Sequence, residues 1–125
     1  MPTLSTEPPV DLDMLRQRCL GNRKLAAMAL KKFDSCVTQD LQTLAQSLRN
    51  GDAKAAASTA HKIKGAAANI SAERVRVIVA QLEALALANA LALACMCLDR
   101  LHGEMDQFRD YLPRALARLE PAPGV

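Results

Sequence analysis

The chain has 125 residues, enough for one domain with a buried core and too few for separate catalytic and regulatory domains. Half of the residues are hydrophobic but only 2% are aromatic, which favours closely packed helices with an aliphatic core over a β-sheet. Sixteen basic and thirteen acidic residues give a net charge of +3, a modest excess that argues against a nucleic-acid-binding protein.

The two ends of the chain lack helical periodicity. Residues 1–10 contain three of the six prolines, so we predict a linker or disordered lead-in there, and a disordered tail at residues 119–125. No secretory leader opens the sequence, and no run of 18 apolar residues could cross a bilayer. We therefore expect a cytoplasmic protein without direct membrane contact, whose folded domain spans residues 11–118.

The spacing of apolar residues predicts five helices in this domain. Their expected ranges are 11–20, 23–49, 53–70, 72–88 and 90–118, joined by short turns. Ser71 is the expected N-cap of the fourth helix, and Pro113 should kink or shorten the fifth because it removes a backbone donor. We predict an all-α fold, an up-down antiparallel four-helix bundle with a short extra N-terminal helix across one end.

The third predicted helix carries a histidine on its polar face. At about 100° per residue, Lys64, Gly65 and Ala68 lie within about 60° of His61, and the apolar residues lie on the opposite side. The imidazole should therefore be exposed. A glycine inside a helix costs about 1 kcal/mol relative to alanine, and here it would leave room for another molecule to approach the ring.

These residue types suit the transfer of a phosphoryl group. A neutral imidazole has one nitrogen free as a nucleophile, and Lys64 could stabilise the negative charge of a phosphoryl group. Lys62 adds positive potential at the margin. Spacing alone leaves open that His61 is an ordinary solvated histidine, because short motifs also occur by chance.

Other candidate residues are weaker. His102 precedes Gly103 but lacks the lysine and the small neighbours, so we interpret it as an exposed helical histidine. No histidine and carboxylate spacing predicts a metal site. We interpret the four cysteines as reduced, packed thiols. The methionines expected in the core are Met14, Met28, Met96 and Met105.

The segment AHKIKGAAANI, residues 60–70, is preceded by Asn50-Gly51-Asp52 and followed by Leu82-Glu83. This pattern resembles the histidine phosphotransfer (HPt) domain of multistep two-component phosphorelays, and the likeness extends over about residues 11–118. It implies a four-helix bundle in which His61 accepts a phosphoryl group from a receiver-domain aspartate and donates it to another. Members commonly have glycine at the position of Ser71.

The resemblance also implies roles for the surrounding residues. Lys64 would stabilise the phosphoryl charge and Gly65 would give steric access. Lys62 and Ala68 would contact the docked partner. A polar side chain on the next helix would orient the histidine ring; Gln81 and Glu83 flank Leu82, and the helical wheel does not choose between them.

The expected partners are response-regulator receiver domains and a hybrid sensor histidine kinase. We expect a monomeric carrier with no cofactor of its own, Mg²⁺ being held by the receiver. The sequence has no glycine-rich phosphate loop, so ATP-dependent kinase activity is not expected. The alternatives are a non-catalytic helical bundle that docks and sequesters a receiver domain, and a basic helical nucleic-acid binder, which would show a strongly salt-dependent affinity.

Overall fold

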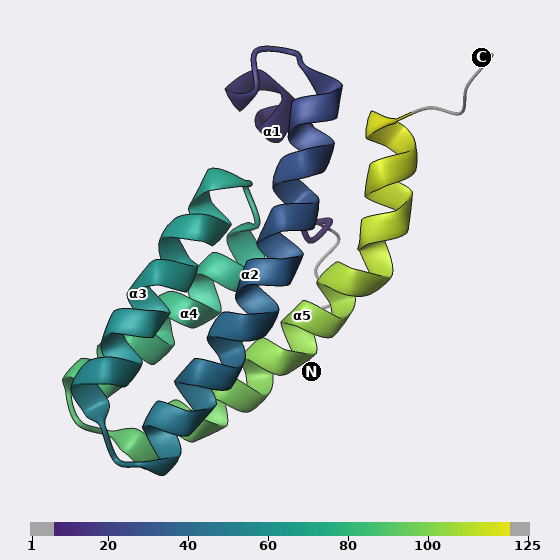
Figure 1. Ribbon diagram of the computed structural model, residues 1–125. Helices are drawn as coiled ribbons and strands as arrows, with labels where there is room; N and C mark the ends of the chain where they lie inside the picture. Colours follow the sequence, from purple (N-terminus) through teal and green to yellow (C-terminus); the bar gives the residue numbers. More distant parts are fainter. Residues whose placement is uncertain (1–6, 121–125) are drawn as a thin grey trace.

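The computed structural model describes residues 7–120, which form five helices and no strand (Figure 1). The helices are α1 (Leu12–Arg18), α2 (Arg23–Arg49), α3 (Ala53–Asn69), α4 (Glu73–Leu87) and α5 (Leu91–Leu119). Both α2 and α4 pack against α3 and α5, so these four helices close into a bundle. The short α1 lies at one end, beside the start of α2. The predicted all-α bundle with an extra N-terminal helix is confirmed.

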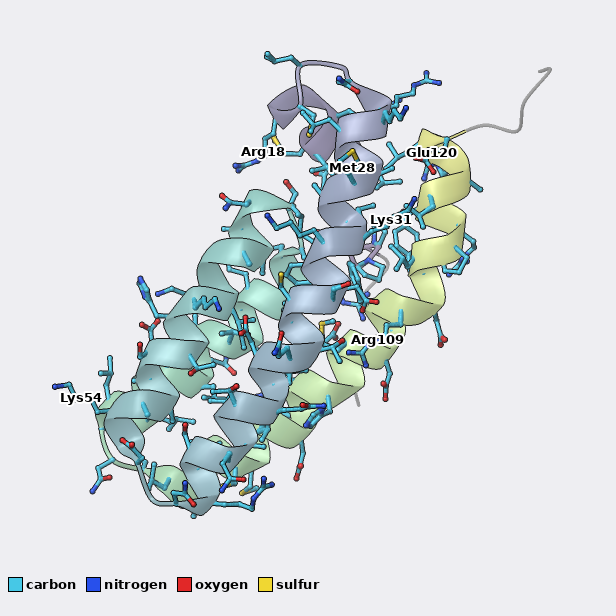
Figure 2. All side chains as sticks on the ribbon, viewed as in Figure 1. Arg18, Met28, Lys31, Lys54, Arg109 and Glu120 are labelled. Carbon is cyan, nitrogen blue, oxygen red and sulfur yellow. The ribbon has the colours of Figure 1, made fainter. Side chains whose placement is uncertain are left out.

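Small and aliphatic side chains fill the core of the bundle. Four alanines and one isoleucine are the buried residues of α3, which allows this helix to approach its neighbours closely. Of the four methionines expected in the core, Met105 is fully buried, but the other three are between 43% and 64% exposed. Met28, for example, lies on the outer face of α2 (Figure 2). The prediction of packed thiols also fails for Cys36 and Cys95, which are exposed.

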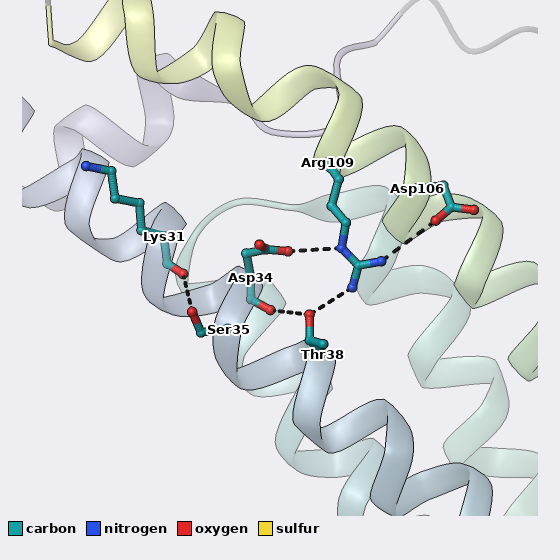
Figure 3. Close-up of polar contacts among 6 residues, drawn as sticks. All are labelled: Lys31, Asp34, Ser35, Thr38, Asp106 and Arg109. Carbon is teal, nitrogen blue, oxygen red and sulfur yellow. Dashed lines mark hydrogen bonds and ion pairs between the residues drawn. The ribbon is translucent and has the colours of Figure 1, made fainter.

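The two long helices extend beyond the two short ones at the end where α1 lies (Figure 1). α2 has 27 residues and α5 has 29, whereas α3 has 17 and α4 has 15. Phe33 and Phe108 join the long helices edge to face, with ring centroids 5.2 Å apart. The Arg109 guanidinium donates to the Asp34 carboxylate at 3.1 Å and to the Thr38 hydroxyl at 2.9 Å (Figure 3). These contacts join α2 to α5.

The first four helices end in the same backbone motif. At the end of α3, the amide of Ser71 donates to the carbonyl of Ala68, and the amide of Ala72 donates to the carbonyl of Ala67. This pair of bonds is the Schellman motif, which requires a residue in the left-handed region. The residues that adopt it are Leu20, Gly51, Ser71 and Asn89. The turns between helices are therefore short, and α2, α3, α4 and α5 each run antiparallel to the next helix of the bundle (Figure 1).

The predicted role of Ser71 as the N-cap of α4 is wrong. Its φ of 60° makes Ser71 part of the end of α3, and the N-cap of α4 is Ala72, which has no side-chain hydrogen bond to offer. Serine is a common N-cap because its hydroxyl can accept from a helical amide. Here the Schellman turn places Ser71 one residue too early to do so.

Pro113 lies inside α5, which continues to Leu119. The expectation that the proline shortens the helix is therefore wrong. A proline in a helix lacks the amide that would bond to the carbonyl four residues earlier, and this loss is a known cause of bending. Figure 1 shows α5 bending in its C-terminal third, in agreement with the predicted kink.

The packed unit begins before residue 11. Pro9 and Val10 are buried, and the amide of Asp11 donates to the carbonyl of Ser71 at 3.1 Å. Leu119 is also buried, one residue beyond the predicted end of the domain. Residues 1–6 and 121–125 of the predicted lead-in and tail lie outside the described residues. Within residues 7–120, no helix is long and apolar enough to cross a membrane.

Leu20 allows a test of the strain in these turns, because it combines a φ of 55° with 94% exposure. The left-handed conformation costs about 1–2 kcal/mol, and glycine adds an entropic cost of about 0.5–1 kcal/mol. We expect Leu20→Gly to raise the free energy of unfolding by about 0.5–1 kcal/mol, measured by urea denaturation. Asn89→Gly is the matched control and should gain less, since asparagine tolerates this conformation. A loss of stability in Leu20→Gly would contradict the expectation.

Candidate functional site

His61 lies midway along α3 with its side chain 70% exposed. Its Nδ1 atom is 2.8 Å from Oε2 of Glu83, which comes from the neighbouring helix α4. Leu82, the residue before Glu83, is buried in the core. The Glu83 side chain lies at the edge of this buried face of α4, at the boundary with α3. The wheel prediction of an outward-facing imidazole agrees with this placement.

The Glu83 carboxylate is shared between two partners. Its second oxygen, Oε1, accepts a hydrogen bond from Nζ of Lys64 at 2.6 Å, and the Glu83 side chain is only 15% exposed. The hydrogen bond from Lys64 lowers the pKa of Glu83 against the opposing effect of burial, and the bond to His61 lowers it further. The carboxylate is therefore ionised at neutral pH and accepts from both neighbours.

This contact determines which nitrogen of His61 can react. An ionised carboxylate can only accept, so Nδ1 of the neutral ring must carry the proton when it bonds to Glu83. The other nitrogen, Nε2, then has a free lone pair. The ring is mostly exposed, so Nε2 can meet a group that approaches from outside the bundle.

The structure places the two candidates for ring orientation on different sides of α4. Glu83 contacts His61, whereas the side-chain oxygen of Gln81 accepts a hydrogen bond from Arg100 of α5 at 3.0 Å. Gln81 is therefore directed toward α5. The choice depends on which flank of α4 faces α3, and this is a property of the bundle as a whole.

A second carboxylate, which sequence analysis missed, lies beside Lys62. Nζ of Lys62 is 3.2 Å from Oδ1 of Asp40 on α2. Each of the two lysines next to His61 thus pairs with an acidic side chain of a neighbouring helix. No sequence signal links Asp40 to Lys62, because the contact depends on how α2 and α3 align. The surroundings of His61 are consequently close to neutral rather than strongly positive.

Gly65 is exposed, one turn beyond His61 on the same face of α3. Apart from its chain neighbours and the nearby backbone of α3, a Cβ atom placed on Gly65 would meet no heavy atom within 4 Å, so packing inside the protein does not require a glycine here. The same holds for Gly103 on α5. Ala68, the other small residue of this face, is partly buried and lines a hollow between α3, α1 and α4.

His102 is exposed on α5 and lies in a different hollow, together with side chains of α2. This hollow is lined neither by His61 nor by the lysines and carboxylates that pair beside it. No cluster of three or more histidine, cysteine or acidic side chains in residues 7–120 could hold a metal ion.

The chain folds into a four-helix bundle and presents an exposed imidazole that a carboxylate orients. These two features together indicate a class of helical proteins that use a histidine for group transfer. Residues 29–111 match the family model of the Hpt domain, and this match covers more than half of the chain. The chain therefore belongs to the Hpt domain family, and it acts in histidine phosphotransfer in phosphorelays. Proteins of this family are carriers of phosphoryl groups rather than kinases.

A solved structure with the same fold is the crystal structure of histidine-containing phosphotransfer protein B (HptB) from Pseudomonas aeruginosa PAO1. The TM-score is 0.82, and the alignment covers 90% of this chain and 98% of that chain at 24% sequence identity. At this identity the likeness concerns the fold alone. Comparison with curated proteins gave no match.

The shared carboxylate predicts a pH-dependent stability. Because the pKa of Glu83 is lowered in the folded protein, its stabilising effect is present above its ordinary value of 4.5 and is lost as the pH falls through the lowered value. We expect Glu83→Gln to be less stable than the wild type at neutral pH, with a difference that shrinks in acid. Urea denaturation at about pH 3 and about pH 7 measures this difference.

Glu73→Gln is the control for this experiment. The pKa of Glu73 is also lowered, by its hydrogen bond to Arg76, but the Glu73 side chain is 62% exposed and water screens the pair. Its effect at neutral pH should be smaller. An equal destabilisation by Glu83→Gln in acid and at neutral pH would contradict the linkage.

Proposed function

We propose that this chain is a phosphorelay carrier in which His61 accepts a phosphoryl group from the aspartate of one receiver domain and donates it to the aspartate of another. The observation that carries the proposal is the 2.8 Å contact of His61 Nδ1 with Glu83, because it leaves Nε2 of an exposed ring as the nucleophile. The family membership supports the same chemistry.

In the accepting step, the lone pair of Nε2 attacks the phosphorus of an aspartyl phosphate. A nitrogen–phosphorus bond forms, the bond between phosphorus and the aspartate oxygen breaks, and the electron pair returns to the aspartate as a carboxylate. The imidazole becomes positively charged while Nδ1 keeps its proton, and the ionised Glu83 stabilises this charge. Donation to a second receiver is the same step in reverse.

Lys64 has to change partner during this cycle. In the resting protein its ammonium group bonds to Glu83 at 2.6 Å, and its side chain is less than one third exposed. A phosphoryl group on Nε2 would bring additional negative charge and three acceptor oxygens within reach of a flexible lysine. Lys64 would then stabilise the phosphoryl group while Glu83 keeps its bond to Nδ1.

The remaining components come from the partners. We propose that the receiver domains and a hybrid sensor histidine kinase supply the phosphoryl group, and that Mg²⁺ belongs to the receiver site rather than to this chain. Lys62 and Ala68 would lie under the docked receiver. Transfer of this kind requires one exposed histidine per encounter, so a monomer suffices.

The phosphoryl acceptor can be tested with His61→Gln and Lys64→Ala. After incubation with a receiver domain, Mg²⁺ and a small phosphodonor, intact mass should show an acid-labile phosphoryl adduct on the wild type and none on His61→Gln. Lys64→Ala should accept about tenfold or more slowly, since it loses one charge-stabilising group. Equal labelling of the wild type and His61→Gln would exclude His61 as the acceptor. Binding of receivers without any adduct would favour a bundle that only sequesters them.

Gly65 provides a separate test of steric access. Gly65→Gln should raise the free energy of unfolding by about 0.5–1 kcal/mol through helix propensity, since nothing beyond its chain neighbours and the nearby backbone of α3 lies within 4 Å of the new Cβ. The same variant should transfer at least about tenfold more slowly with a receiver, because the longer side chain occupies the approach to His61. Phosphoramidate, a small donor, should still label it. Rates come from phosphohistidine formation over time.

Gly103→Gln is the matched control for the access test. It is also an exposed helical glycine with free space around its Cβ position, but it lies on α5. It should gain similar stability and keep normal transfer. Unimpaired receiver transfer in Gly65→Gln would contradict the assigned role of Gly65.

A further inference from the structure

A hollow of about 430 Å³ lies between α1, the end of α3 and the start of α4. Ala68 of α3 forms part of its wall, with Met14 and Arg18 of α1 and Arg76 of α4. The Met14 side chain, on the short helix α1, is 43% exposed. Flexible methionine side chains adapt to different partner surfaces. The hollow thus combines the apolar side chains of Met14 and Ala68 with polar and charged ones, which are Asp11, Arg18, Ser71, Glu73 and Arg76.

Of the four charged side chains that line the hollow, one lacks a partner among residues 7–120. The Asp11 carboxylate accepts from the amide of Met14 as the N-cap of α1, and the Glu73 carboxylate pairs with Arg76 at 2.5 Å. Arg18 is exposed and makes no hydrogen bond or ion pair with another of residues 7–120. Figure 2 shows its side chain extending outward from α1. Its planar guanidinium can therefore bind a carboxylate from outside with two parallel hydrogen bonds.

The hollow is close enough to His61 to lie under a docked receiver. Ala68 is seven residues from His61, which corresponds to about 10 Å along the helix axis. Even a small specific interface buries about 600 Å² on each partner, equivalent to a disc of about 14 Å radius. Gly65 and Lys64 lie between His61 and Ala68 on this face of α3. Gly65 has no side chain, and the Lys64 side chain is hydrogen-bonded to Glu83.

We propose that the hollow receives an apolar side chain of the receiver domain, that Arg18 pairs with a receiver carboxylate beside it, and that this contact selects which receivers exchange phosphoryl groups with His61. The inference rests on the proposed function and adds a specificity site to it. Arg18 acts in recognition, at the hollow that it lines together with Ala68, and does not touch the reacting nitrogen. The selected receivers carry an acidic residue next to an apolar one at the matching position.

The test measures phosphoryl transfer to the Arg18→Glu variant. The donors are purified receiver domains that are encoded in the same genome and that phosphorylate the wild type. We expect the KM for such a receiver to rise about tenfold with little change in kcat, because a recognition contact is lost. Direct labelling of His61 by phosphoramidate should stay unchanged. Arg18→Gln should shift the KM in the same direction by less, and Met14→Ala should raise it about threefold. Circular dichroism verifies the fold of each variant.

Lys54→Glu is the matched control. Lys54 is an exposed cation on α3, also seven residues from His61 but toward the opposite end of the helix (Figure 2). Lys54→Glu makes the same change of charge as Arg18→Glu, at a position as far from His61 along α3 as Ala68 is, and Lys54 does not line the hollow. Its effect should be smaller and should disappear at high salt, as expected for a long-range charge effect.

The possible outcomes separate the two proposals. Normal transfer by Arg18→Glu, or equal effects of Arg18→Glu and Lys54→Glu, would overturn the selection by Arg18 and leave the carrier function intact. A wild type that accepts no phosphoryl group from any receiver would overturn both. Recovery of transfer to Arg18→Glu when one acidic residue of the receiver is replaced by lysine would identify the paired carboxylate.

Discussion

The site depends on one carboxylate that two side chains share. Glu83 of α4 bonds to Nδ1 of His61 at 2.8 Å and to Nζ of Lys64 at 2.6 Å, so one carboxylate holds two side chains of α3. The bond to Nδ1 leaves the reactive lone pair on Nε2. The bond to Lys64 places the lysine ammonium group at the same carboxylate as the His61 ring. Ionisation of Glu83 is maintained by these same partners, despite its partial burial.

Such short contacts are possible only because α3 and α4 lie close together. The buried face of α3 consists mainly of alanines, which bring the two backbones near each other. The Schellman turn from Ile70 to Ala72 reverses the chain within three residues and keeps the helices antiparallel. The alanine-rich composition of the chain thus has a direct consequence for the chemistry of His61.

The proposed roles of His61 and Arg18 separate reaction and recognition in space. Around His61 each lysine is paired with a carboxylate, Lys62 with Asp40 and Lys64 with Glu83, so the immediate site has little excess charge. An approaching receiver brings its own carboxylates, and a strongly positive site would bind them without discrimination. In the proposed division, specificity comes from Arg18 at the edge of the docking face, where an unpaired charge can select a partner.

The sequence by itself determined the helices, the bundle and an exposed histidine with a lysine and a glycine on its face, because these follow from periodicity and local residue types. Only the tertiary structure decided between Gln81 and Glu83, which lie about 200° apart around α4, and placed Asp40 beside Lys62. It also assigned Ser71 to the end of α3 rather than the start of α4. These outcomes depend on the relative rotation and alignment of packed helices, which arise from contacts between residues far apart in the chain.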